Sequence, residues 1–268
     1  MKKLDHLSEI YKNYDTFVID LWGVMHNGIT LNRSALKVID ELKKNSKKIV
    51  FLSNAPRPSS KVISFLLKMK MDKKYLTNVI TSGEAAMHAI NENKFGKKFY
   101  HLGPPRDTSI FEKVKDNRTN IENSDFILCT GLLDDYGQDL EYYKKFLKKY
   151  ISKKLVCTNP DLTVHRGDKE EYCAGYIAKI FEQLGGKVIY YGKPHEEIYK
   201  MCFNYNEKVL AIGDNLRTDI KGANNINKDC LFIAEGVHRN EFKDETEIQN
   251  LLTKYNVKAN YYQKELLW

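Results

Sequence analysis

The chain has 268 residues, of which 42% are hydrophobic, and its formal net charge is +8. This length is ample for a sizeable core in one or two domains, and the composition excludes a disordered chain. No apolar run reaches the roughly 18 residues that a membrane helix needs, and the N-terminal residues lack the apolar segment of a signal peptide. We therefore expect a soluble, cytoplasmic protein with no membrane partner.

The positive charge comes mostly from lysine: of the 43 basic residues, 36 are lysine and seven are arginine. The lysines are scattered over what we interpret as solvated helix faces, for example at residues 43–48 and 144–149. Proteins that read nucleic-acid sequence depend on arginine and on a concentrated basic patch. We therefore expect no nucleic-acid partner.

Short apolar runs recur along the chain and predict strands, and most of them end in Gly, Asn or Asp. They cover residues 16–22, 48–55, 97–103, 125–131, 154–160, 187–193, 209–215 and 230–236. Between them, apolar residues at helical spacing predict helices near residues 62–69 and 173–184. This alternation predicts an α/β fold with a mostly parallel sheet. The five cysteines, none spaced as C-x-x-C, are expected to be buried, reduced thiols.

Four predicted strand ends carry polar side chains suited to chemistry, and ligands bind beyond the carboxyl ends of parallel strands. The first end has Asp20, the second Ser53 and Asn54, the third Lys193, and the fourth Asp214, followed by Asp219. Each alone has an ordinary explanation as a cap, a turn or a surface residue.

Together, these side chains are what phosphoryl transfer through a hard cation requires. Carboxylates are preferred ligands of Mg²⁺, and an aspartate is already ionised and nucleophilic at neutral pH. A lysine offsets the repulsion between a carboxylate and a phosphate, while a hydroxyl and backbone N–H groups bind the phosphoryl oxygens.

In this order the motifs resemble those of the haloacid dehalogenase (HAD) superfamily of phosphohydrolases. The pattern is D-x-x-G-V at Asp20, S-N at Ser53, K-P at Lys193 and G-D-x-x-x-x-D ending at Asp219. Longer stretches are similar to class IIA, the NagD-like branch, and to one bacterial subgroup of it with a DLWGV first motif: DLWGVMHNG, FLSNAPRP, TSGEA, NPDLTVHRGD, YCAG and IGDNLRTDIKGA.

The resemblance implies a Rossmann-like core of residues 1–81 and 188–268, with a C2-type α/β cap inserted at residues 82–187. It implies that Asp20 is the nucleophile and that Lys193 lies between the nucleophile and the phosphate. It also implies that Ser53 and Asn54 bind the phosphoryl oxygens. The implied Mg²⁺ ligands are Asp20, the backbone carbonyl of Trp22, Asp214 and Asp219. A small phosphorylated metabolite is the implied substrate, and the loop at Asn159, Pro160 and Asp161 is expected on the substrate side. A homodimer formed through the cap is plausible by the same resemblance.

The chain departs from the family pattern at Trp22, where the usual D-x-D motif has the aspartate that serves as general acid and base. An indole N–H donates a hydrogen bond but does not release its proton at useful pH. His26 is one substitute acid, because its ordinary pKa of ~6.5 suits the task; Asp161 and His165 are others. The alternative for His26 is that it packs in its loop or caps a turn.

Two functions stay open at this point. One is a Mg²⁺-dependent phosphohydrolase or phosphotransferase with an altered site, which works through a phosphoaspartate. The other is a weak or inactive module that retains the metal site and binds a phosphorylated ligand. Because the nucleophile, the lysine and the metal carboxylates are all present, we favour the enzyme.

Overall fold

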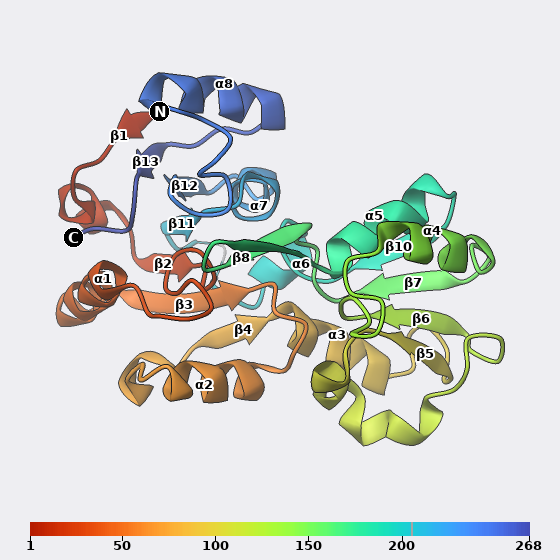
Figure 1. The fold of residues 1–268 in the computed structure, drawn as a ribbon. Coiled ribbons are helices and arrows are strands. Elements are labelled where there is room, and N and C mark those ends of the chain that lie inside the picture. Colours follow the sequence, from red (N-terminus) through yellow and green to blue (C-terminus); the bar gives the residue numbers. More distant parts are fainter. Residues whose placement is uncertain (205) are drawn as a thin grey trace.

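The molecule has two lobes, each built on its own parallel sheet (Figure 1). The structure, a computed structural model, describes residues 1–204 and 206–268. The larger sheet has the strand order β1-β13-β12-β11-β2-β3-β4 and the smaller one β10-β7-β6-β5. Every strand pair in these two sheets is parallel. The predicted α/β fold with a parallel-sheet core is therefore confirmed.

The larger lobe is formed by the two ends of the chain. Its strands are β1 (Lys2–Lys3), β2 (Thr16–Ile19), β3 (Lys48–Ser53), β4 (Val79–Thr81), β11 (Val209–Gly213), β12 (Asp229–Ile233) and β13 (Tyr261–Gln263). Its helices are α1 (Arg33–Lys44), α2 (Ser59–Lys68), α6 (Glu196–Tyr199), α7 (Lys221–Asn225) and α8 (Glu245–Tyr255).

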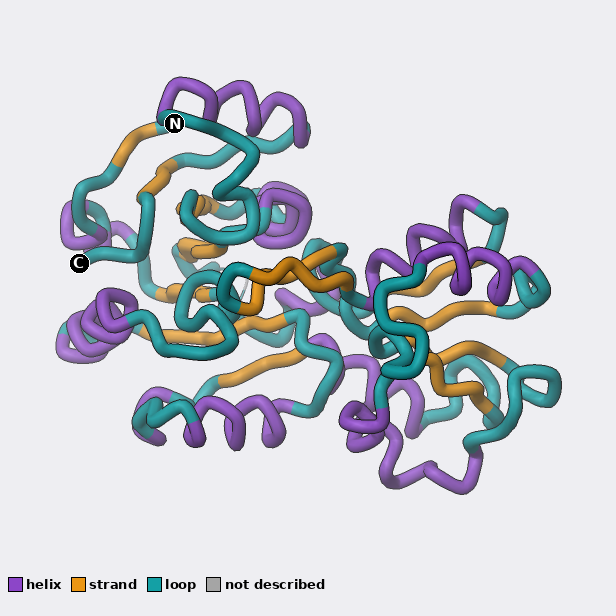
Figure 2. Tube along the Cα trace, viewed as in Figure 1, coloured by secondary structure: helices purple, strands orange, loops and turns teal. Residues whose placement is uncertain are grey.

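The smaller lobe is formed by the middle of the chain. Its strands are β5 (Phe99–Leu102), β6 (Phe126–Cys129), β7 (Lys154–Cys157) and β10 (Lys187–Tyr190). Its helices are α3 (Ser82–Asn91), α4 (Leu140–Lys148) and α5 (Ala174–Gln183). A separate antiparallel hairpin, β8 (Thr163–Arg166) with β9 (Lys169–Tyr172), lies between the two lobes in the view of Figure 2.

The central strands are covered by helices on both faces, which is why they are apolar throughout. All four residues of β2 are buried. Phe17 and Ile19 pack in one hydrophobic cluster with Val38 of α1, while Val18 packs in another with Ile198 of α6. A strand buried on both faces holds the residue that follows it in a rigid position.

Helix α1 shows how local sequence sets an element's limits. The side chain of Asn32 accepts hydrogen bonds from the backbone N–H groups of Ser34 and Ala35 at the helix start. The helix buries Ala35, Val38, Ile39 and Leu42, which share one face by helical spacing. The two helices predicted near residues 62–69 and 173–184 are α2 and α5.

The chain enters the smaller lobe after β4 and leaves it after β10. The expected cap boundary at residue 187 falls inside β10, which pairs with β7 of the smaller sheet. We therefore propose a core of residues 1–81 and 191–268 and a cap of residues 82–190. All five cysteines are buried and unpaired. Within residues 1–204 and 206–268, no helix has the length and apolar character needed to cross a membrane.

Candidate active site

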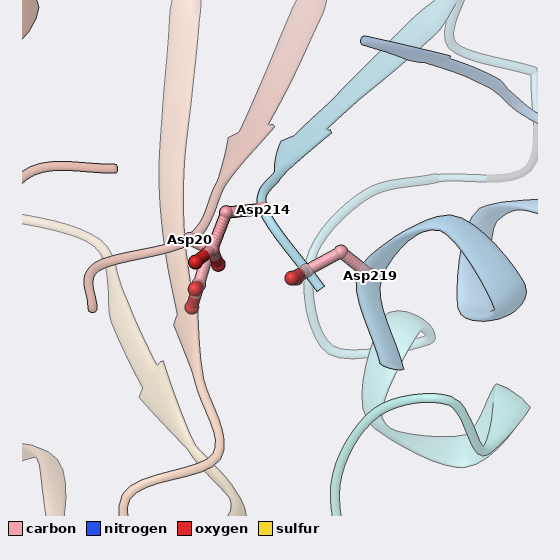
Figure 3. A group of neighbouring side chains, drawn as sticks. All are labelled: Asp20, Asp214 and Asp219. Carbon is pink, nitrogen blue, oxygen red and sulfur yellow. The ribbon is translucent and has the colours of Figure 1, made fainter. Parts of the chain in front are cut away.

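Three carboxylates meet at the carboxyl edge of the larger sheet. Asp20 follows β2 and Asp214 follows the neighbouring strand β11, so the parallel register brings the two side chains together. Asp219 lies in a π-helical turn directly after β11. Oxygen atoms of Asp20, Asp214 and Asp219 lie within 4.8 Å of one another, and the three carboxyl groups converge in Figure 3.

Close backbone approach makes this convergence possible at Gly23, the glycine of the first motif. Gly23 has a φ of +88°, and a Cβ there would lie 2.0 Å from a carboxylate oxygen of Asp214. Any larger residue would be strained and would push Asp214 out of the cluster. The D-x-x-G spacing therefore places the loop after Asp20 directly against the second carboxylate.

Lys193 is the central cation of the site. Its Nζ donates hydrogen bonds to Oδ1 of Asp20 at 2.7 Å, to Oδ1 of Asp219 at 2.6 Å and to the carbonyl oxygen of Leu52 at 2.9 Å. Burial favours the neutral amine, but the surrounding carboxylates, led by Asp20 and Asp219, outweigh that effect and raise the pKa of Lys193. The lysine is therefore charged.

One lysine does not balance three buried carboxylates. Burial raises the pKa of Asp20 to about 8, against the opposing effect of Lys193, and Asp219 adds to the rise. Burial and the charges of Asp20 and Asp219 also raise the pKa of Asp214. A divalent cation among these oxygens would favour the ionised forms of Asp20 and Asp214, and an all-oxygen donor set suits Mg²⁺. The residues present therefore fit a magnesium site.

Ser53 and Asn54 stand at the end of β3, next to β2 in the sheet. The Ser53 hydroxyl oxygen accepts a hydrogen bond from the N–H of Ala55 at 3.2 Å, which leaves its proton for a ligand. Asn54 is bonded on both sides of its amide: Oδ1 accepts from the backbone N–H of Lys193 at 2.8 Å, and Nδ2 donates to the carbonyl oxygen of Lys193 at 3.1 Å. Asn54 thus fixes the loop that carries the lysine.

Trp22 contacts the β8–β9 hairpin. Its indole Nε1 donates to the backbone carbonyl oxygen of His165 at 2.8 Å. Gly28, with a φ of +83°, admits the indole, because a Cβ there would lie 2.5 Å from the ring. The guanidinium carbon of Arg166 lies 5.2 Å from the centre of the ring. The residue in the usual acid position thus contacts the cap.

His26 is buried beside Trp22 in the loop that follows Asp20. Its Nδ1 accepts a hydrogen bond from the N–H of Gly28 at 3.0 Å, and its ring packs edge-on against Trp22 and Phe65. Burial, with a smaller effect of Arg166, lowers the pKa of His26 to about 4. The imidazole is therefore neutral at neutral pH, and the structure supports packing in the loop over the hypothesis of a substitute acid.

Asp161 brings a half-buried carboxyl group from the cap to the core. Its Oδ1 accepts hydrogen bonds from Nδ2 of Asn54 at 3.2 Å and from Nδ2 of Asn215 at 3.3 Å, and its backbone N–H donates to Oδ1 of Asn159 at 3.1 Å. Burial raises the pKa of Asp161, against an opposing effect of Lys193. Asn159 thus shapes the loop, and Asp161 presents a carboxyl group that gains protons readily.

A cavity of about 280 Å³ connects these groups. Asp20, Asp214, Ser53, Asn54, Asn159, Asp161, Trp22 and His26 all line it, together with residues of both lobes. Sequence reasoning did not identify Asn215 or the arginines of the lining. Asn215 could have been recognised as a site residue because it directly follows Asp214. No local sequence pattern marks the arginines as cavity residues.

The comparisons with known proteins agree with this geometry. Residues 17–115 match the family model of haloacid dehalogenase-like hydrolases, and residues 190–255 match a second HAD-hydrolase-like model. A crystal structure of a haloacid dehalogenase-like hydrolase from Brucella suis 1330 superimposes with a TM-score of 0.87 at 28% identity, covering 98% of this chain and 100% of that one.

Two curated relatives are phosphatases by name. The 5'-nucleotidase YutF of Bacillus subtilis is 24% identical over 247 residues, covering 86% of this chain and 91% of its own. The ribonucleotide monophosphatase NagD of Escherichia coli is 29% identical over 147 residues, covering 53% and 56%. The chain belongs to the haloacid dehalogenase-like hydrolases and, within them, to the NagD-like phosphatases of class IIA. The family and the enzyme class predicted from the sequence are thereby confirmed.

Proposed function

We propose that the protein is a Mg²⁺-dependent phosphohydrolase or phosphotransferase that acts on a small phosphorylated metabolite through a phosphoaspartate at Asp20. The observation that carries the proposal is the bond of Lys193 to both Asp20 and Asp219 inside the cluster completed by Asp214. The YutF and NagD names denote enzymes that act on nucleotides, which supports a phosphate monoester as substrate.

The metal would be held by Asp20, Asp214 and Asp219 together with the backbone carbonyl of Trp22. When bound, Mg²⁺ supplies charge neutralisation for an anionic phosphoryl group. Lys193 adds a fixed positive charge at the nucleophile, and the Ser53 hydroxyl offers a hydrogen bond to a phosphoryl oxygen. These contacts lower the repulsion between Asp20 and the phosphate.

The first chemical step forms one bond and breaks another. A carboxylate oxygen of Asp20 attacks phosphorus, and the bond from phosphorus to the leaving oxygen breaks with its electron pair on that oxygen. Trp22 has no proton to give, so we assign the proton to Asp161, the cap carboxyl group with a raised pKa. In the second step, Asp161 takes a proton from water as the water attacks phosphorus and releases Asp20 and phosphate.

The test is turnover of an activated aryl phosphate with added Mg²⁺. We expect the wild-type protein to release phosphate and to be inactive after chelation of the metal. Asp20→Asn should lose roughly 10⁴-fold or more of the rate, because removal of a covalent nucleophile has effects of that scale. If wild type releases no phosphate from any monoester but binds phosphate in a Mg²⁺-dependent way, the second function, a binding module, is correct. The cytoplasmic location and the homodimer stay predictions.

A further inference from the structure

Of the lysines and arginines that the structure describes, only arginines line the cavity at the candidate active site. Among the described residues, four of the seven arginines of the chain line it and none of the lysines do: Arg57, Arg106, Arg166 and Arg239. Arginine presents a planar fork of donors that binds carboxylates and phosphates in a bidentate way, whereas lysine acts as a point charge. Arg57 and Arg106 are already ion-paired, with Asp107 at 2.6 Å and with Asp134 at 3.0 Å. Arg166 and Arg239 are therefore the arginines to consider as a site for a planar anion.

Arg166, the last residue of β8, is the arginine held closest to Trp22. Its guanidinium stacks over the Trp22 ring at 5.2 Å, within the range of a cation–π contact. Its Nε donates to Oε2 of Glu171 across the hairpin at 3.3 Å. The terminal nitrogens Nη1 and Nη2 take part in neither contact. The side chain is thus oriented in advance while its two outer nitrogens stay available.

Glu171 does not cancel the positive charge of this region. Lys169 lies 3.7 Å from the same carboxylate, so one negative charge is shared between two cations. Arg239 adds a third, because its Nη2 donates to the carbonyl oxygen of Gly167, next to Arg166, at 3.1 Å. The other two acids of the hairpin, Asp168 and Glu170, are exposed, where water screens their charges.

Trp22 and Arg166 bring this charge to the cavity of the reaction centre, because both residues line it together with Asp20. In the usual family pattern an aspartate occupies the position of Trp22, and a carboxylate there would attract an arginine and neutralise it. An indole instead supports the guanidinium without opposing its charge. The substitution that removes an acid therefore creates a platform for a cation.

We propose that Arg166, supported by Trp22, binds a second anionic group on the leaving-group side of the substrate. The preferred substrates are then phosphate monoesters that also carry a carboxylate or another phosphate. The inference rests on the proposed function, because it concerns the substrate of that same site.

The experiment compares two aryl phosphates that are nearly equal in shape and differ in charge: 4-carboxyphenyl phosphate and 4-carbamoylphenyl phosphate. Hydroquinone bisphosphate, which carries a second phosphate in place of the carboxylate, tests whether the second anionic group is a phosphate. We expect wild type to prefer an anionic substrate over the carboxamide by about 10- to 100-fold in kcat/KM, the range of one charge-assisted hydrogen-bonded contact. Whichever anionic substrate is preferred identifies the anion.

The variants test the assignment to Arg166. The quantity compared is the ratio of kcat/KM for the anionic substrate to kcat/KM for the neutral substrate. Arg166→Met should bring the ratio close to that of the uncatalysed reactions, and Arg166→Lys should restore part of it. Trp22→Leu should reduce it by removing the platform. Arg118→Met, an exposed arginine outside the cavity, is the matched control and should keep both the ratio and the activity.

A ratio that is the same in wild type and Arg166→Met overturns the inference and leaves the proposed function intact. Because the readout is a ratio, a general loss of folding or activity does not imitate the expected result. If wild type turns over none of the substrates, the proposed function fails separately. Calorimetric titration of the anionic and neutral substrates into wild type and Arg166→Met then decides whether Arg166 binds the anion.

Discussion

The floor and the roof of the cavity are built in different ways. The floor is the carboxyl edge of a parallel sheet, and its Lys193 and Asp20 are only 3% and 8% exposed. The roof is the short β8–β9 hairpin, and the side chain of its Arg166 is 43% exposed. The floor gains precision from strands buried on both faces and strong electrostatics from exclusion of water.

The roof is fixed to the core by a few polar contacts. Trp22 donates to the His165 carbonyl oxygen at 2.8 Å, the Gly167 N–H donates to the Asn27 carbonyl oxygen at 3.1 Å, and Arg239 donates to the Gly167 carbonyl oxygen at 3.1 Å. Such contacts contribute about 0.5–1.5 kcal/mol each. From this difference we infer that the chemical step depends on the rigid sheet edge. The hairpin, which has fewer contacts, can differ in its residues and so determine which leaving group is bound. Asp161 lies where the two meet.

The largest effect is expected for Asp161→Asn, which removes the proton donor and keeps the shape of the side chain. Turnover of alkyl phosphates should fall by about 10²–10⁴-fold, the usual range of acid–base help. Turnover of aryl phosphates should fall less, because their leaving groups are stable as anions. The measurement is the rate of the chemical step for both classes, with Asp168→Asn, an exposed acid of the same roof, as control.

The pH profile gives an independent readout of the same residue. A general acid acts in its protonated form, and burial raises the pKa of Asp161 while Lys193 opposes the rise and Asp219 adds to it. Alkyl turnover should therefore fall as pH increases through that raised pKa, and Asp161→Asn should lack this alkaline limb. Equal losses for alkyl and aryl substrates, with an unchanged pH profile, would contradict the assignment.

The next effect concerns the stability of the floor. Mg²⁺ should stabilise the folded protein by about 2.7 kcal/mol when its concentration is 100 times the Kd. Asp214→Asn should abolish that gain, and it should stabilise the metal-free protein because it removes a buried like charge. Thermal unfolding with and without Mg²⁺ measures both, and Asp135→Asn, an exposed acid, is the control. An unchanged response to Mg²⁺ in Asp214→Asn would exclude this residue from the metal site.

The smallest effect on the chemistry is expected at His26. Because its imidazole is neutral and packed against Trp22 and Phe65, His26→Ala should lower the free energy of unfolding by about 1–3 kcal/mol. The ratio of alkyl to aryl turnover should stay as in wild type. Denaturant unfolding and the two rates check this, and a selective loss of alkyl turnover would show instead that His26 is the acid.

The sequence by itself determined the sheet and its reactive edge. The predicted apolar runs correspond to β2, β3, β5, β6, β7, β10, β11 and β12. Because parallel strands end at a common edge, the order of residues alone was enough to place Asp20, Ser53 and Asp214 together. Of the strands that escaped detection, β1, β4 and β13 have only two or three residues. Strands β8 and β9 are as long as β2 but lack an apolar run (TVHR and KEEY).

Only the tertiary structure decided what surrounds that edge. The bond between Asn54 and Asp161 spans 107 residues of sequence, and the bond between Trp22 and His165 spans 143. Such contacts depend on how the inserted lobe lies on the core, which no local pattern records. The sequence identified the absent acid at Trp22. The contacts of the indole, a hydrogen bond to the hairpin and a position beneath Arg166, depend on how the two lobes pack together.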